Sequence, residues 1–296
     1  MYLNDFEYFA PQTSAEALSL AARLGSKAKI LAGGTDLLIM MKEKILKPEC
    51  LININDIQEF KTISYVPGQG AVIGAAVKIS ALEHDSLIKD KYFALHQAAG
   101  ELGSAQVRAM ATVGGNSCHA SPAAETPPPL AALGARVVIC SSAGEKEMPV
   151  EKFILGNRKT ALGEGELLTK FILPEPAPRS ASRYAYIGLR DAMEIDAVNM
   201  AVNLVLEEDC RTVKNLKLVM GSVSPVPLVA EKIPGILIGK ELTDELLAQA
   251  AQAACDEAKP ISDIRASAEY RREMVAVLTR RVLKQAFHAA AGLKEA

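Results

Sequence analysis

The stretch that decides the fold is TVGGN at residues 112–116, which continues into ASPAAETP at residues 120–127. Another glycine turn, AGGTD, lies earlier in the chain at residues 32–36. We call AGGTD the first glycine turn and TVGGN the second. Glycine lets the backbone approach a ligand closely, and successive amides form a concavity that binds anions. Two such turns in one chain, each with a threonine hydroxyl, predict a phosphorylated cofactor that is held from two sides.

Each glycine turn has a defined set of candidate contacts. We expect the turns to offer unpaired amides at Gly33, Gly34, Gly114 and Gly115, with hydroxyl donors at Thr35 and Thr112. A carboxylate is a poor phosphate ligand, so we expect Asp36 to cap the helix that follows it, with a ribose contact as the second choice. For either loop taken alone, a tight turn without any ligand remains an alternative.

The composition excludes several classes of protein. The 296 residues carry a net charge of −2, which argues against a nucleic-acid or membrane-surface role. No window approaches the roughly 18 apolar residues of a membrane span. The N-terminal residues have neither a positive region nor an apolar core of signal-peptide length. The sequence therefore predicts a cytoplasmic protein without membrane insertion.

Metal and acid–base motifs are missing from the sequence. The five cysteines and four histidines are scattered without metal-ligand spacing, so we expect no metal bound by this chain. Neither glycine turn runs into Gly-Lys-Ser/Thr, and no nucleophile elbow or cluster of catalytic carboxylates occurs. A cradle without such machinery is typical of a flavin site, because a flavin needs only position and electrostatics from its protein.

The first part of the chain predicts mixed α and β structure. A helix over residues 13–25 begins with a capping box formed by Thr13 and Glu16, and a second box, Ser80 with Glu83, opens a helical stretch to residue 110. Prolines 127–129 introduce a short helix at residues 130–133. Strands are predicted at residues 7–11, 29–32, 51–55, 136–140 and 167–173, with a hairpin over 63–77.

A linker divides the chain. Three prolines within residues 174–178 cannot continue a helix or a central strand. Strands at residues 184–189, 198–206 and 213–219 follow, and then helices at 241–258 and 267–290. Strands followed by helices predict an α+β domain, in which an antiparallel sheet carries helices on one face.

Several motifs together resemble one known family. The two glycine turns, the segment at residues 120–122 and PLAAL at residues 129–133 look like the FAD-binding medium subunit of molybdenum hydroxylases. Residues 184–201 and IRASAEYR at residues 264–271 also resemble that family. The motif RDAM at residues 190–193 leans toward the xanthine dehydrogenase branch over the carbon monoxide dehydrogenase branch.

The resemblance implies both fold and function. The implied fold is a two-subdomain FAD-binding module of the vanillyl-alcohol-oxidase/PCMH type over residues 1–175, followed by an α+β C-terminal domain over residues 181–292. The implied function is an electron-transfer subunit. A large molybdenum-cofactor subunit hydroxylates substrate, a small [2Fe-2S] subunit relays the electrons, and FAD passes them to NAD, ferredoxin or another acceptor. Because this chain has no matching cysteine cluster, we expect FAD as its only cofactor.

The resemblance also implies a set of cofactor-binding residues. By this resemblance, the first loop (residues 30–37) and the second glycine turn hold the diphosphate and its neighbourhood. Leu102 and Leu168 lie along the flavin, and Tyr186 and Ile195 lie near it. The full implied set is Ile30, Leu31, Ala32, Gly33, Gly34, Thr35, Asp36, Leu37, Leu102, Thr112, Gly114, Gly115, Asn116, Glu125, Leu168, Tyr186 and Ile195.

Two positions depart from the family pattern. Glu125 replaces the usual aspartate on the ribose or adenine side and is one methylene longer, so its contact must shift. Tyr186 stands where lysine is common, and our hypothesis is that the missing charge favours a low-potential acceptor. Two other readings stay open: a self-contained flavin-dependent reductase or oxidase of the same fold, and an assembly protein that has kept the fold without FAD.

Overall fold

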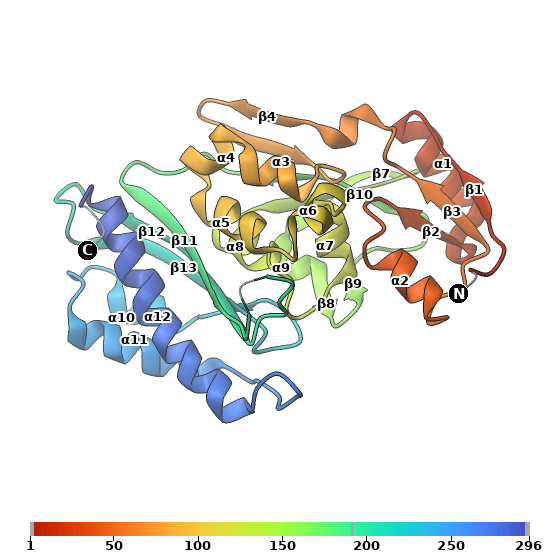
Figure 1. Ribbon diagram of the computed structural model, residues 1–296. Coiled ribbons are helices and arrows are strands. Elements are labelled where there is room, and N and C mark those ends of the chain that lie inside the picture. Colours follow the sequence, from red (N-terminus) through yellow and green to blue (C-terminus); the bar gives the residue numbers. More distant parts are fainter. Residues whose placement is uncertain (1–2, 191, 294–296) are drawn as a thin grey trace.

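The computed structural model describes residues 3–190 and 192–293 (Figure 1). Met1, Tyr2 and Asp191, the last of which belongs to the RDAM motif, lie outside these ranges. Within them the strands form sheets of three, five and four strands and a two-stranded hairpin. The three-stranded sheet lies near the N-terminus and the four-stranded sheet lies at the other end of the molecule (Figure 1).

The first subdomain is a small parallel sheet of order β1-β3-β2. Glu16 donates its amide to Thr13 Oγ1 at 3.2 Å, so the predicted cap of the first helix is confirmed. Its apolar face, with Ala17 and Ala21, packs on Ile52 and Phe60. The elements are β1 (Glu7–Phe9), α1 (Ser14–Leu24), η1 (Gly25–Lys27), β2 (Ala28–Leu31), α2 (Leu37–Lys42), β3 (Cys50–Asn53) and η2 (Gln58–Lys61).

The second subdomain is built on an antiparallel sheet of order β4-β5-β10-β6-β7. The predicted hairpin is confirmed as β4 and β5, whereas the sequence pattern does not predict the edge strand β7. The strands are β4 (Ile63–Val66), β5 (Gly70–Gly74), β6 (Arg136–Ser141), β7 (Gly144–Pro149) and β10 (Leu167–Leu173), with the hairpin β8 (Ile154–Gly156) and β9 (Lys159–Thr160).

The predicted helical stretch over residues 80–110 is confirmed, but it is divided into four short helices. Asp85 ends one helix and caps the next by accepting from the Ile88 amide at 3.0 Å. Gly103 adopts φ +56°, and Ser104 then caps a further helix. The predicted box of Ser80 and Glu83 is wrong, because Glu83 pairs instead with Arg108 at 2.7 Å. The stretch is divided into α3 (Ile79–His84), α4 (Ser86–Lys91), α5 (Phe93–Glu101) and α6 (Ala105–Met110).

Three further helices complete this subdomain. Helix α7 contains the second glycine turn, and α8 starts at the first of the three prolines, earlier than the sequence pattern indicates. Proline is tolerated there because the first amides of a helix have no intrahelical partner. The helices are α7 (Val113–His119), α8 (Pro127–Ala132) and α9 (Val150–Phe153).

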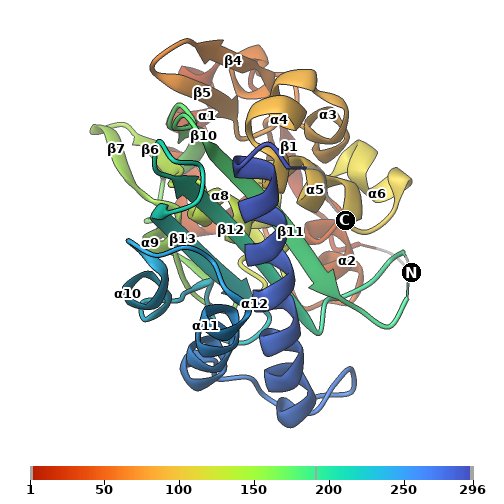
Figure 2. The same ribbon diagram turned by 90° about the vertical axis from the view of Figure 1, so that its left-hand side faces the viewer.

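The C-terminal domain is an antiparallel sheet of order β11-β12-β13-β14, as expected for the α+β class. Helix α12 crosses one face of this sheet (Figure 2). Apolar residues of the sheet, α11 and α12 form one continuous core. The elements are β11 (Ser180–Ile187), β12 (Val198–Leu206), β13 (Val213–Gly221), β14 (Leu228–Val229), α10 (Ile233–Leu237), α11 (Asp244–Glu257) and α12 (Ala268–Ala290).

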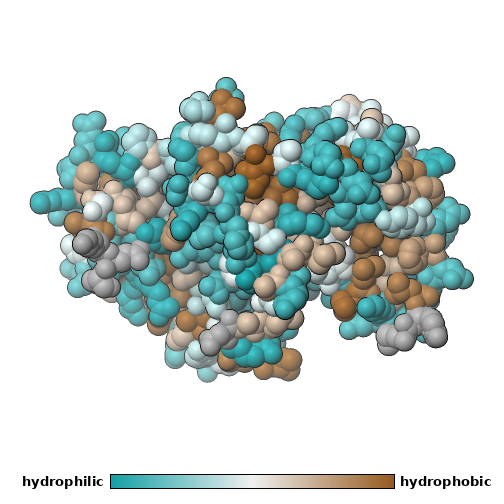
Figure 3. All heavy atoms as spheres, turned by 45° about the horizontal axis from the view of Figure 1, so that its top comes forward, coloured by the Kyte–Doolittle hydropathy of each residue, from teal (hydrophilic) through white to brown (hydrophobic). Residues whose placement is uncertain are grey.

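The opposite face of that sheet packs on the second subdomain. Tyr184, Ala201 and Val219 belong to the same buried cluster as residues of α5 and α8. The domains therefore share a core, and Met193 in the connection between β11 and β12 donates its amide to Gly103 O of the second subdomain at 2.9 Å. On the face shown in Figure 3, hydrophobic residues occur in small groups among hydrophilic ones. No helix among the described residues combines the length and apolarity needed to cross a membrane.

Candidate functional site

The two glycine turns line one cleft. The cleft has a volume of about 970 Å³ and runs between the first subdomain, the second glycine turn and the start of the C-terminal domain. Fifteen of the seventeen residues implied by the sequence line it. Leu31 and Tyr186 do not, and Tyr186 packs instead against the main core. The fold thus brings together loops from both subdomains and Ile195 from the C-terminal domain.

The first loop presents unpaired donors. The amides of Gly33, Gly34, Thr35 and Asp36 have no hydrogen-bond acceptor among the described residues. Gly34 has φ +75°, which favours glycine and turns the loop at this point. Successive free amides of this kind form an anion-binding concavity. The prediction of unpaired amides at this loop is confirmed.

The second glycine turn differs from the prediction. Gly114 donates its amide to Ala75 O at 2.9 Å, and Gly115 donates to Thr112 Oγ1 at 3.0 Å. A Cβ at Gly114 would lie 2.6 Å from Ala75 O, so this glycine serves close packing on the strand end. A Cβ at Gly115 would meet only Thr112 Oγ1 within 4 Å. The expectation of unpaired amides at this turn is therefore wrong, and Gly115 instead leaves room for the Thr112 hydroxyl that caps α7.

Asp36 does not cap the following helix. Its backbone has φ −99° and ψ −48°, which is helical, whereas an N-cap residue is normally extended. Its side chain makes no capping hydrogen bond, and its Oδ1 lies 3.6 Å from His119 Nε2 on α7. The carboxylate therefore connects the two glycine turns across the cleft.

Polar residues that the sequence pattern did not indicate hold the first loop in place. Asn55 donates to Ala32 O at 2.6 Å, and Lys78 donates to Asn55 Oδ1 at 3.1 Å and to Met110 O at 2.9 Å. Burial lowers the pKa of Lys78. No local motif marks Asn55, Lys78 or His119, because each acquires its role only when distant segments meet.

Comparison with known proteins assigns the family. The FAD binding domain in molybdopterin dehydrogenase matches residues 4–176, and the CO dehydrogenase flavoprotein C-terminal domain matches residues 183–286. The chain belongs to the flavoprotein family of molybdopterin dehydrogenases. FAD is therefore its cofactor.

Relatives align over nearly the whole chain. The carbon monoxide dehydrogenase medium chain of Hydrogenophaga pseudoflava is 32% identical over 95% of this chain and 97% of that protein. The xanthine dehydrogenase FAD-binding subunit of Escherichia coli O157:H7 is 28% identical over 96% and 97%, respectively. The solved carbon monoxide dehydrogenase from H. pseudoflava, which lacks the Mo-pyranopterin moiety, superimposes with a TM-score of 0.92 and 32% identity, covering 98% of this chain and 99% of that chain.

The cleft of this family member fits FAD. Its volume of about 970 Å³ suits a large cofactor, since small-molecule sites span about 300–1,000 Å³. Basic and acidic side chains in its lining nearly balance: Lys29, Arg158 and Lys159 face Asp36, Glu125, Glu164 and Glu166. Fixed charge therefore offers a diphosphate little attraction, whereas the unpaired amides of the first loop are donors that it could use.

A buried acidic network borders the same cleft. Asn116 donates to Glu125 Oε2 at 3.4 Å, while Tyr184 and Asn199 donate to Asp196 Oδ2 at 3.0 and 2.8 Å. Burial, reinforced by the negative charge of Asp196, raises the pKa of Glu125 to about 8. Burial likewise raises the pKa of Asp196 to about 7. Neither carboxyl is paired with a basic side chain in the described part of the chain.

The raised pKa of Glu125 predicts a pH-dependent stability. The value of about 8 exceeds the ordinary 4.5, so the folded state favours the protonated carboxyl. The stability that the protonated Glu125 carboxyl contributes is fully present below pH 4.5 and is lost as the pH rises through 8. We expect ionisation of Glu125 to cost the FAD-free protein about 2 kcal/mol between pH 5 and pH 9, less than the whole shift implies because water reaches the cleft. Glu125→Gln removes this part of the loss and keeps the part that Asp196, whose pKa is also raised, contributes.

Urea unfolding at both pH values measures this effect. The matched control is Glu273→Gln, which changes an exposed glutamate on α12 and keeps the wild-type pH dependence. An unaltered loss of stability in Glu125→Gln contradicts the assignment.

Proposed function

We propose that this chain is the FAD-binding electron-transfer subunit of a multi-subunit molybdenum hydroxylase. It accepts electrons from iron–sulfur clusters of a small partner subunit, which receive them from a large molybdenum-cofactor subunit, and passes them to an external acceptor such as NAD or ferredoxin. The observation that best supports this function is the cleft, which both glycine turns line. The chain also aligns over nearly its whole length with medium-chain and FAD subunits. Bound FAD supplies the electron-carrying chemistry.

Our residue assignments within this function follow the cleft. The amides of residues 33–36 hold the diphosphate, and Gly115 leaves room for it. Leu102, Leu168 and Ile195 contact the flavin ring, and Glu125 lies on the ribose or adenine side. The support is that all of these residues line one cleft, with the unpaired donors at one loop. We assign residues 1–175 to the FAD-binding unit and residues 181–292 to the C-terminal domain.

The proposal remains at the level of the superfamily. Relatives from the carbon monoxide and xanthine dehydrogenase branches align over similar lengths at 32% and 28% identity, so the lean toward xanthine dehydrogenase gains no support over its alternative. No relative named above favours the self-contained reductase or oxidase. A cytoplasmic location is part of the proposal, supported by five cysteines that are all free thiols, as expected in a reducing compartment.

Isolation of the tagged chain from its own cells tests this function. We expect stoichiometric FAD, and co-purification of a large subunit that contains molybdenum and a small subunit that contains iron. The chain expressed alone is expected to bind FAD without either metal. Mixing it with the dithionite-reduced small subunit, after removal of excess dithionite, should bleach the flavin absorbance.

Two results would overturn the proposal. Oxidation of an organic substrate by the chain alone would support a self-contained flavoenzyme. A correctly folded, colourless chain that cannot take up FAD would support the assembly-protein alternative.

A further inference from the structure

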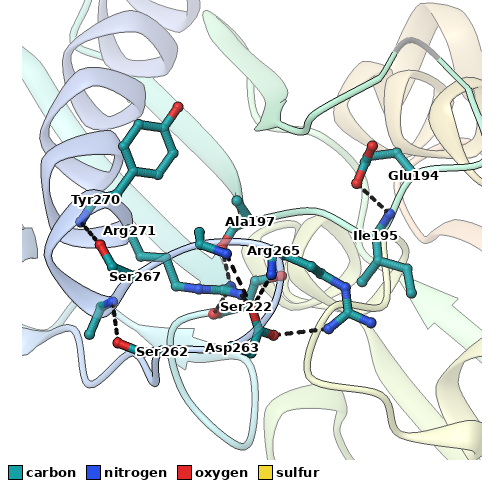
Figure 4. Close-up of polar contacts among 12 residues, drawn as sticks. Glu194, Ile195, Ala197, Ser222, Ser262, Asp263, Arg265, Ser267, Tyr270 and Arg271 are labelled. Atoms are coloured by element: carbon teal, nitrogen blue, oxygen red, sulfur yellow. Dashed lines mark hydrogen bonds and ion pairs between the residues drawn. The ribbon is translucent and has the colours of Figure 1, made fainter.

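Arg271 is a buried arginine that the cofactor assignment does not use. Only 3% of its surface is exposed, although it lies in the first turn of α12. Its Nη1 donates to Ala197 O and Ser222 O, and its Nη2 lies 2.8 Å from Asp263 Oδ1 (Figure 4). One guanidinium therefore connects three segments that are far apart in the sequence.

Two of those segments border the cofactor cleft. Ala197 closes the base of the connection between β11 and β12 by donating its amide to Ile187 O at 2.8 Å. Two residues earlier in the chain, Ile195 lines the cleft. Ser222 donates its amide to Pro122 O at 2.8 Å, and the flanking Ser121 and Ala123 also line the cleft. Arg271 thus contacts segments that flank both walls and does not itself line the cleft.

The third segment pairs the charge of the guanidinium and orients it. Asp263 also accepts from the Arg265 amide at 2.9 Å and from the Arg265 guanidinium at 2.9 Å (Figure 4). Burial acts to raise the pKa of Asp263, but these hydrogen bonds and the pairing with Arg271 hold it below its usual value. A buried arginine needs such an ionised partner, since an unpaired buried charge destabilises the fold strongly.

We propose that Arg271 is a positioning residue for the FAD site. Resting on the proposed function, this role consists of holding Ile195 and the segment around Pro122 at their places in the cleft wall, without touching the cofactor. The planar fork of arginine reaches acceptors on three segments at once. Lysine carries one compact ammonium group and cannot reproduce that geometry. The effect on FAD should therefore follow the shape of the side chain as well as its charge.

Substitutions at Arg271 test the role in the full-length chain. We compare Arg271→Lys and Arg271→Met with Arg272→Lys and Arg272→Met, which alter the exposed neighbour on the same helix. Fluorescence titration of the FAD-free proteins gives the Kd for FAD, and visible circular dichroism reports the surroundings of the bound flavin. We expect Arg271→Lys to raise Kd about 10-fold, equivalent to about 1.4 kcal/mol, and to alter the flavin dichroism.

Hydrogen–deuterium exchange separates positioning from general destabilisation. In Arg271→Lys, faster exchange is expected at residues 195–197 and 222, with the α11–α12 core unchanged. Asp263→Asn should reproduce these changes more weakly, because Arg271 keeps its two carbonyl acceptors. The Arg272 variants should match wild type in every measurement. If Arg271→Met does not fold, the lysine and Asp263→Asn proteins decide the question.

Different outcomes contradict different claims. Wild-type Kd and dichroism in folded Arg271→Lys would refute the positioning role and leave the FAD assignment intact. A raised Kd with faster exchange throughout the C-terminal core would also refute it, because the residue would then act only through stability. A folded wild-type chain that binds no FAD would refute the proposed function itself.

Discussion

Gly115→Val is expected to weaken FAD binding strongly in an otherwise folded chain. Outside its chain neighbours and its own helix backbone, a Cβ at this position would meet only Thr112 Oγ1, at 2.8 Å, within 4 Å. The remaining valine atoms must therefore occupy the cleft that Gly115 lines. Overpacking of this kind commonly costs about 1–3 kcal/mol, and at this site the loss falls on the cofactor. We expect Kd to rise about 100-fold, near the upper end of that cost.

The measurement is flavin fluorescence titration of the purified, FAD-free chain. Gly235→Val is the matched control, because Gly235 lies in α10, is exposed and has no heavy atom within 4 Å of its Cβ position. That variant should bind FAD as wild type does. Normal FAD occupancy in folded Gly115→Val would remove the second turn from the cofactor site.

Gly33→Ala is expected to destabilise the fold itself. Its Cβ would lie 2.4 Å from Met110 O and 2.8 Å from Ala111 Cα, and these backbone atoms cannot rotate away. The first loop would have to move off the segment before α7, which Lys78 and Asn55 hold beside it. We expect a loss of about 3 kcal/mol, which lowers Tm by roughly 6–12 °C, together with weaker FAD binding.

Thermal unfolding of the FAD-free protein checks this effect separately from the cofactor. Gly100→Ala is the control: it lies in α5 with no heavy atom within 4 Å of its Cβ position, so its Tm should stay the same or rise slightly. A Gly33→Ala protein with the wild-type Tm would show that the loop can shift freely. The two glycines would then differ less than their surroundings indicate.

Local sequence signals predicted much of the fold. The cap at Thr13, the hairpin around β4 and β5, the proline linker and the strands β12 and β13 all depend on neighbours in the chain, and each is present. The helical stretch over residues 80–110 is present, but its division was not predicted, because Asp85 and the pair Gly103 and Ser104 separate helices within a continuous apolar pattern. Only one or two residues mark such a helix end, so a hydrophobic pattern considered over thirty residues does not reveal it.

The sequence by itself determined the cofactor class, the order of the domains and the two loops that meet at the cleft. Glycine turns carry their conformational freedom wherever they occur, which is why they can be recognised without the fold. The tertiary structure decided that only the first loop keeps its amides unpaired, since Ala75 and Thr112 take those of Gly114 and Gly115. It also decided that Asp36 faces His119 and that Arg271 joins two segments that flank the cleft. These contacts join residues distant in sequence, and no local pattern encodes which donor will meet which acceptor.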